Sequence, residues 1–200
     1  MVRDQALHVS GLLSKKRHGP PVNPRQPNIG LKAAFGGGID WKVSEGEDQY
    51  RRGLYTTWRR SNPYPSMATF DAPNREVCVV RRDRTNTPLQ ALVTLNDPVF
   101  MEAAQALARK LAEKELCPED TVDYAIWRCL SRPAKKAERQ ALAVLYTKTY
   151  DRLQQEPDRA LPLATDPIGP IPEGSDVIAL ASWAVVSNVL LNLDEIFLKP

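Results

Sequence analysis

The residues best suited to chemistry gather in residues 50–98. This stretch contains no lysine but many arginines, whose guanidinium groups are planar, permanently charged and able to bind an oxyanion through two parallel hydrogen bonds. The eight arginines are Arg51, Arg52, Arg59, Arg60, Arg75, Arg81, Arg82 and Arg84, and the four acids are Asp71, Glu76, Asp83 and Asp97. The composition therefore indicates either a site for an anionic ligand or a set of internal ion pairs.

The first interpretation is a polyanion site, for a sulfated or uronic polysaccharide or for nucleic acid. In this interpretation arginines bind the anionic groups and aromatic rings stack between them. The candidate ligand-binding residues are Arg75, Arg81, Arg82, Arg84, Asn86 and Trp58. Because the net charge of the whole chain is only +3, no global field favours nucleic acid. An anionic glycan is the better candidate of the two.

The second interpretation is structural. The same arginines would pair with the four acids and with carbonyls at helix ends, and would tie loops to the helices. The chain would then be a non-catalytic docking module that contacts another part of its own domain or a partner. Apolar surface exposed on the N-terminal helix and on the long loop would favour this interpretation.

The third interpretation is enzymatic. Asp71, Glu76 and Asp97 are candidates for a general acid or base acting on a glycan, with Arg81 or Arg84 holding an anionic group. Asp71 and Asp97 are also expected at helix starts, where capping alone explains a carboxylate. The sequence therefore leaves open whether the chain is an enzyme.

The cysteines and histidines indicate no metal site and no cofactor in this chain. Cys78, Cys117 and Cys129 form no CxxC motif, and Cys78 between valines is typical of a small core residue more than of a nucleophile. A helix over residues 121–130 would place Cys129 roughly 12 Å or more from Cys117. A disulfide needs Cα atoms within about 7 Å, so this pair is the less favoured alternative.

The elements that must position these residues are mainly helices. We expect a helix over residues 3–13, then a proline- and glycine-rich segment to residue 48. For residues 50–60 strand and helix compete, and we favour helix. Asp71 is predicted to cap a short helix reaching residue 79, and Thr87 another with Pro88 at its first position.

The C-terminal half has clear helical periodicity. Asp97 should cap a helix over residues 98–115, Asp120 or Glu119 one that ends near residue 130, and Asp176 an apolar helix over residues 177–191. A further helix is expected over residues 134–155. The predicted fold is therefore mainly α, with an irregular arginine-rich segment over residues 1–97 and a helical bundle over residues 98–200.

Several of these segments resemble one known family. The segments are Arg3–Asp4–Gln5–Ala6, Ser10–Gly11–Leu12–Leu13, Phe70–Asp71–Ala72–Pro73, the run RTNTPLQAL over residues 84–92, Leu95–Asn96–Asp97–Pro98 and Leu191–Asn192–Leu193–Asp194–Glu195. Together they resemble the C-terminal end of the planctomycete PSD-one domain, a domain of unknown function found after cytochrome-c-like modules in large secreted bacterial proteins. The resemblance covers nearly the whole chain.

The resemblance implies three expectations. Because such domains are longer, this chain would be the C-terminal end of a larger domain, with the missing N-terminal part as its first partner. The parent protein would be extracytoplasmic (periplasmic or secreted), although residues 1–13 have no apolar core of signal-peptide length and no segment reaches the roughly 18–20 apolar residues of a membrane span. Haem would belong to a separate module, because this chain lacks a CxxCH motif.

Overall fold

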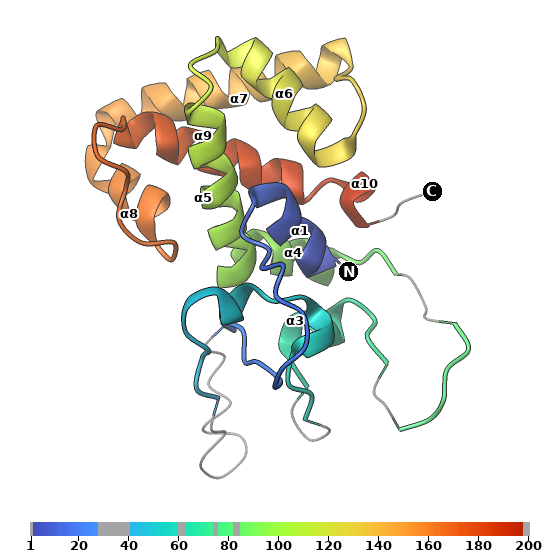
Figure 1. Cartoon of the computed structure of the whole chain (residues 1–200). Coiled ribbons are helices and arrows are strands. Elements are labelled where there is room, and N and C mark those ends of the chain that lie inside the picture. Colours follow the sequence, from blue (N-terminus) through green and yellow to red (C-terminus); the bar gives the residue numbers. More distant parts are fainter. Residues whose placement is uncertain (1, 28–40, 60–62, 74–75, 82–84, 198–200) are drawn as a thin grey trace.

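Two long helices crossing near the middle of the molecule organise the fold (Figure 1). The computed structural model describes residues 2–27, 41–59, 63–73, 76–81 and 85–197. Helix α5 (Pro98–Ala112) packs across α9 (Val177–Leu191), and this is the most extensive helix pair in the described chain. Both helices bury most of their circumference, which the almost entirely apolar sequence of α9 predicts.

Helices from both ends of the chain cover this central pair. Helix α7 (Lys136–Gln155) and α8 (Ala160–Thr165) pack on α9, and α6 (Pro118–Leu130) packs on α7. Helix α1 (Val2–Ser10) lies against α5, and the short α10 (Asp194–Phe197) contacts α1 and α6. The N-terminal helix is therefore part of the packed body.

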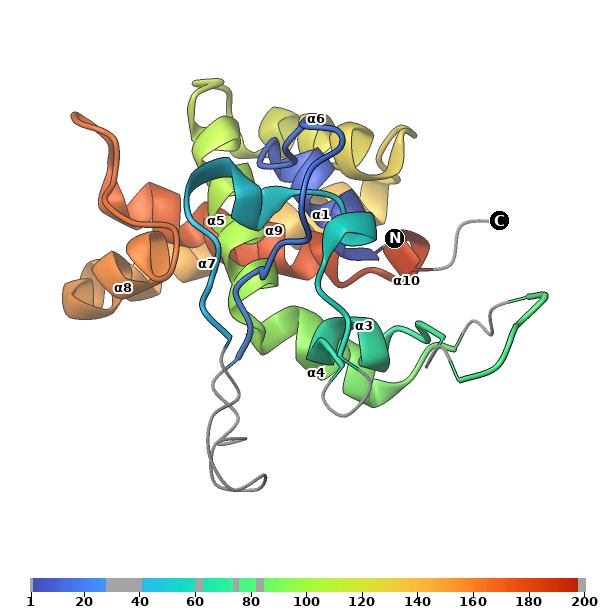
Figure 2. The ribbon, with the colours of Figure 1, turned by 60° about the horizontal axis from the view of Figure 1, so that its bottom comes forward.

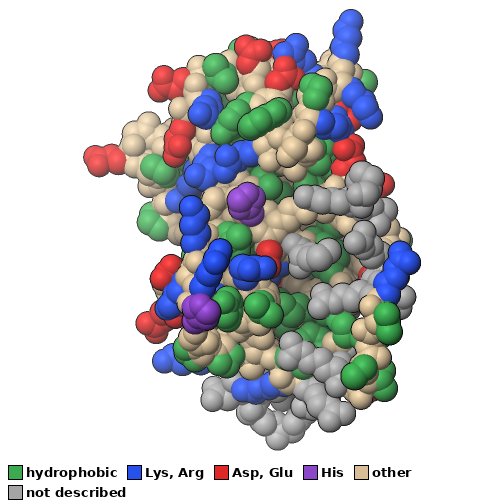
Figure 3. Space-filling view, turned by 45° about the vertical axis from the view of Figure 1, so that its right-hand side comes forward, with side chains coloured by type: hydrophobic (Ala, Val, Ile, Leu, Met, Phe, Trp, Pro, Cys, Tyr) green, Lys and Arg blue, Asp and Glu red, His purple; other side chains and the backbone are tan. Residues whose placement is uncertain are grey.

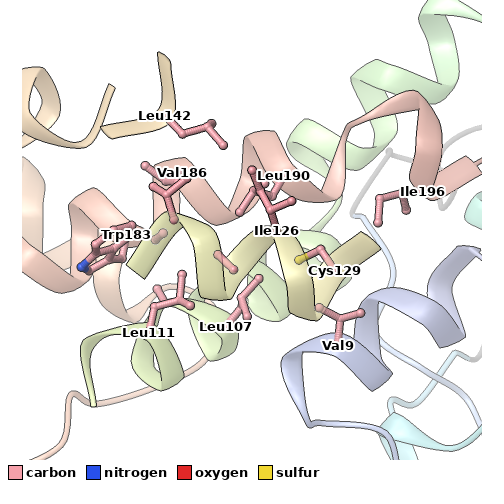
Figure 4. Close-up of a cluster of buried hydrophobic side chains, with 14 residues drawn as sticks. Val9, Leu107, Leu111, Ile126, Cys129, Leu142, Trp183, Val186, Leu190 and Ile196 are labelled. Atoms are coloured by element: carbon pink, nitrogen blue, oxygen red, sulfur yellow. The ribbon is translucent and has the colours of Figure 1, made fainter. Parts of the chain in front are cut away.

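The main core lies where α5, α6 and α9 meet (Figure 4). Leu107 and Leu111 of α5 face Ile126 of α6, while Val186 and Leu190 come from α9. The predicted apolar stripe of α5 is buried as expected; its members are Phe100, Ala103, Ala104, Leu107, Ala108 and Leu111. Close packing of such side chains supplies most of the stabilisation of a helical bundle.

Three predicted helix starts are confirmed by their cap geometry. Thr87 and Gln90 form a capping box at the start of α4 (Pro88–Asn96), with Pro88 at the first helical position. The Asp97 carboxylate accepts a hydrogen bond from the Val99 amide at the start of α5. Asp176 does the same for α9. Each side chain satisfies a helix amide that would otherwise lack a partner.

The irregular N-terminal segments run side by side across one end of the body, as Figures 1 and 2 both show. The Val22 amide donates to the Tyr55 carbonyl (2.8 Å), the Thr57 amide donates to the Val22 carbonyl (2.9 Å), and Val22 and Thr56 form an isolated parallel bridge. The prediction of a helix over residues 50–60 is therefore wrong for the described residues 50–59. Pairing with residue 22 fixes an extended backbone at Thr56 and Thr57, and the 3₁₀ turns Gly46–Tyr50 and Gly53–Tyr55 precede it.

The predicted cap role of Asp71 is also wrong. Asp71 follows the end of α3 (Pro65–Thr69) and has a left-handed backbone (φ 56°). Its carboxylate instead accepts hydrogen bonds from the amide (2.9 Å) and hydroxyl (2.9 Å) of Thr85. Asp71 thus joins the two ends of a loop. The described residues of this loop, 72–73, 76–81 and 85–87, contain no helix.

Helix α6 starts earlier than predicted. Its cap residue is Cys117, and neither Asp120 nor Glu119 holds that position. Pro118 occupies the first helical position, where a proline ring is tolerated because that residue needs no amide donor. The acids instead lie in the first turn, where negative charge suits the helix dipole.

The predicted fold class is confirmed, since the described residues form a packed arrangement of helices without a β-strand. The boundary proposed at residue 97 stays a prediction. Val9 of α1 shares the main core cluster with α5, α6 and α9. The N-terminal segment is therefore anchored in the bundle's own core.

Candidate functional site

The three candidate catalytic acids have different surroundings. Asp97 is only 4% exposed, between α3 and α5. Asp71 is partly exposed and held by Thr85, while Glu76 is exposed in the loop segment 76–81. Asp97 and Asp71 are thus held by separate sets of partners, and an active site formed by these acids stays a prediction.

The candidate ligand-binding residues are likewise dispersed. Arg75, Arg82 and Arg84 lie outside the described residues. Arg81 is exposed, Trp58 is partly buried, and the Asn86 amide donates to Asp194 Oδ1 at 2.9 Å. On the face drawn in Figure 3, basic side chains are interspersed with hydrophobic and neutral ones.

Two arginines are instead buried and bind backbone carbonyls. The Arg3 guanidinium donates to the carbonyls of Arg51 (2.8 Å) and Gln49 (2.7 Å). Arg51 is completely buried, donates to the carbonyls of Pro20 (3.0 Å) and His18, and lies 3.9 Å from the ring centroid of Tyr55. These two side chains tie α1, residues 18–20 and residues 49–51 together.

Two buried carboxylates, the α5 cap Asp97 and Glu102 of its first turns, lie within the electrostatic influence of Arg3. Asp97 Oδ2 accepts a hydrogen bond from the Ser66 hydroxyl (2.7 Å). Glu102, 3% exposed, accepts one from the Tyr50 hydroxyl (2.7 Å). We call Arg3, Tyr50, Arg51, Tyr64, Ser66, Asp97 and Glu102 the buried polar cluster. It joins the irregular N-terminal segments to the first two turns of α5.

Burial changes the acid strength of this cluster. Loss of hydration raises the pKa of Asp97, against the opposing effects of the Ser66 and Val99 hydrogen bonds and the Arg3 charge. Burial likewise raises the pKa of Glu102, while Tyr50, Arg25 and Arg3 oppose the increase. The pKa of the Tyr64 phenol is raised mainly by desolvation. Raised carboxyl pKa values occur both at active sites and in structural networks.

The geometry favours a structural role for the buried polar cluster. A general acid or base must lie within hydrogen-bond reach of its substrate, yet Asp97 and Glu102 are almost fully enclosed by protein. Their hydrogen bonds connect segments far apart in sequence. The cluster therefore holds the N-terminal segments against α5. Removing one partner would leave another buried polar group without a hydrogen bond.

Sequence reasoning identified Asp97 but missed Arg3 and Glu102. The available signal was position, because Arg3 shares helical spacing with Leu7 and Ser10, and Glu102 lies between stripe residues of α5. A charged residue within a buried helix face indicates an internal partner. The identity of that partner depends on chain segments about 50 residues away.

The cysteines are free in this structure, with Cys78 and Cys117 exposed and Cys129 buried. The expectation that Cys78 is a core residue is therefore wrong, because its neighbours Val77 and Val79 are exposed too. Within the described ranges, no group of three or more His, Cys, Asp or Glu side chains is placed to hold a metal ion. A search of the same residues finds no helix with the length and hydrophobicity needed to cross a membrane.

The fold and the cluster together define a helical bundle domain whose irregular N-terminal segments are clamped onto its central helix. The chain belongs to the PSD1 family, described as a protein of unknown function (DUF1553), whose family model matches residues 1–146. Neither a curated protein nor a solved structure matches the chain significantly. The matched region contains every member of the buried polar cluster.

Proposed function

We propose that this chain is a docking module of an extracytoplasmic, cytochrome-associated PSD1 protein, and that it binds another part of the same parent protein. The observation that carries the proposal is the outer face of α4. Leu89, Leu92 and Leu95 recur every three residues along this helix and are all exposed. An aligned set of exposed leucines marks an interaction surface far more strongly than scattered ones do.

The other side of α4 explains why the leucines point outward. Gln90 and Thr94 are buried, and the Thr94 hydroxyl donates to Asn192 Oδ1 at 2.6 Å. Gln90 Nε2 donates to the Thr69 carbonyl (2.9 Å) and to Thr85 Oγ1 (2.8 Å). Polar contacts thus fix the inner face, which reverses the usual arrangement of an amphipathic surface helix.

A second exposed apolar segment precedes α4. Residues 76–81, which we call the valine arm, extend away from the helices in Figures 1 and 2. Val77, Val79 and Val80 of this arm are exposed. The valine arm and the leucines of α4 therefore both contribute exposed apolar surface, in adjacent parts of the sequence. Helix α1, where the sequence led us to look for it, is largely buried.

The position of α1 supports a partner within the same parent protein. Val2, at the start of α1, and Val93 of α4 pack against the same buried cluster around Phe100. Any polypeptide preceding α1 in a longer parent would emerge beside α4. Docking of that polypeptide would need no long linker, so its effective concentration at the α4 face would be high.

Hydrogen–deuterium exchange tests this function on the 200-residue chain and on its longer parent. We expect amides of residues 76–81 and 88–96 to exchange more slowly in the parent, while α9 exchanges equally in both. The parent carrying Leu89→Ser and Leu92→Ser should lose the added protection; a Leu161→Ser parent, altered at an exposed leucine of α8, should keep it. Equal exchange at α4 in chain and parent would refute the proposal.

A further inference from the structure

A shallow cavity lies at the corner between α6 and α7, away from the buried polar cluster. It has a volume of about 370 Å³ and is lined by Asp123, Tyr124, Trp127, Pro133 and Ala134. The Trp127 side chain is 63% exposed, although its neighbours Ala125, Ile126 and Cys129 are core residues. A tryptophan left so open beside a concave surface is typical of a binding site.

The corner is held in a fixed shape. Ser131 ends α6 with a left-handed backbone (φ 56°), which turns the chain back toward Trp127. Arg132 then donates to Glu138 of α7 (2.9 Å) and to Glu195 of α10 (2.6 Å). Such preorganisation lowers the entropic cost of binding a ligand.

The cavity combines an apolar floor with a polar rim. Trp127, Pro133 and Ala134 supply the apolar surface. Asp123 at the rim is bound by Arg139 of α7, which neutralises its charge and leaves a carboxylate edge as hydrogen-bond acceptor.

Two positively charged side chains lie close to Tyr124. Lys114 Nζ lies 4.9 Å from the centroid of the Tyr124 ring, and Arg128 Nη1 lies 3.5 Å from its hydroxyl oxygen. Their charges disfavour a cationic ligand on this aromatic surface. The ligand should therefore be neutral or anionic.

We propose that this cavity binds one pyranose ring of a carbohydrate, with the ring stacked on Trp127. A pyranose presents C–H groups on its face and hydroxyl groups around its edge, which matches an apolar floor within a polar rim. The partly positive C–H groups meet the electron-rich face of the indole, and hydroxyl groups reach Asp123 and Tyr124. A protein partner fits less well, because a stable protein interface needs about 800 Å² per side. The residues that follow Ala134 in the chain, Lys135 and Lys136, are charged and exposed.

Protein-observed NMR with defined oligosaccharides tests the proposal on the whole chain. We expect millimolar cellohexaose, chitohexaose or hexagalacturonate to shift the Trp127 indole N–H resonance. Trp127→Ala should weaken binding at least about tenfold, and Trp127→Phe should retain part of it. Because Trp127 is exposed, the thermal midpoint of Trp127→Ala should match that of the original chain. Leu161→Ala, at a comparably exposed site on α8, should leave binding unchanged.

Three outcomes would overturn this inference. They are the absence of a shift with all three saccharides, an affinity unchanged by Trp127→Ala, and a shift produced by an oligoproline peptide but by no saccharide. The inference goes beyond the docking function and uses different helices. Leu89→Ser with Leu92→Ser should leave saccharide binding intact, so failure of one proposal is distinguishable from failure of the other.

Discussion

The Ser66 hydroxyl donates a 2.7 Å hydrogen bond to Asp97 Oδ2, and the other oxygen of that carboxylate accepts the Val99 amide at 2.9 Å. One buried side chain thus caps α5 and fastens α3 to it. The capping role follows from local sequence. The contact with Ser66 depends on the tertiary fold, which places α3 beside the start of α5.

Removing the Asp97 carboxylate should destabilise the protein more than removing an exposed cap does. We expect Asp97→Ala to lower the free energy of unfolding by about 2–3 kcal/mol, because the α5 cap is lost and buried Ser66 loses its acceptor. Asp176→Ala, which removes the cap of α9 at a more exposed position, should cost about 1 kcal/mol. Urea unfolding measures both, and equal losses would contradict the added role of Ser66.

The buried carboxyls should make stability fall as pH rises. The pKa values of Asp97 and Glu102 are raised in the folded protein, so the folded state holds protons that the unfolded state releases. The resulting contribution to the free energy of unfolding is fully present below the ordinary pKa values of 3.8 and 4.5. It is lost as the pH rises through the raised pKa values. Glu138 acts oppositely: Arg132 lowers its pKa to about 2, and its contribution is lost as pH falls from 4.5. Urea unfolding above pH 4.5 therefore isolates the buried pair.

A double variant of Asp97 and Glu102 tests whether these two carboxyls cause the pH dependence of the free energy of unfolding. Asp97→Asn together with Glu102→Gln keeps hydrogen-bond acceptors but cannot ionise. We expect the stability of this double variant to vary less with pH above 4.5. A slope identical to that of the original chain would show that the two carboxyls do not control it.

Arg51 and its neighbour Arg52 should respond very differently to replacement by lysine. Arg51 is completely buried and donates to two carbonyls, which a single ammonium group cannot reproduce with the same geometry. Arg51→Lys should cost about 2–3 kcal/mol, while Arg52→Lys at an exposed position should change stability by less than about 0.5 kcal/mol. Comparable losses would place Arg51 among ordinary surface residues.

We expect Cys78 and Cys117 to react rapidly with a disulfide reagent and Cys129 to react slowly. Cys78 and Cys117 are exposed, whereas burial raises the pKa of the Cys129 thiol to about 12 and removes it from solvent. Denaturant should make all three react. A requirement for reductant before Cys117 reacts would show that Cys117 is disulfide-bonded, which would contradict the structure.

Salt dependence tests the polyanion interpretation of the arginines. That interpretation predicts heparin binding whose log affinity falls steeply with log salt, with a slope of about −0.7 to −0.9 per phosphate-like contact. Arg81→Ala, at an exposed arginine, should weaken the binding and reduce the slope. Salt-independent binding or none would leave the arginines with internal roles only.

Local sequence determined most of the helices because capping and periodicity act over a few residues. Thr87, Asp97 and Asp176 start helices where predicted, and the stripe of α5 is buried. Residues 50–59 and Asp71 departed from prediction because distant partners, Val22 and Thr85, provide hydrogen bonds that outweigh weak local preferences.

The amino-acid sequence by itself thus determined a mainly helical PSD1-family chain with arginine concentrated in one stretch. Tertiary structure alone decided that Arg51 points inward to carbonyls while Leu92 and Trp127 face outward. The physical reason is that burial depends on which segments meet. A buried charge requires partners from elsewhere in the chain, and an exposed apolar face results when no described segment covers it.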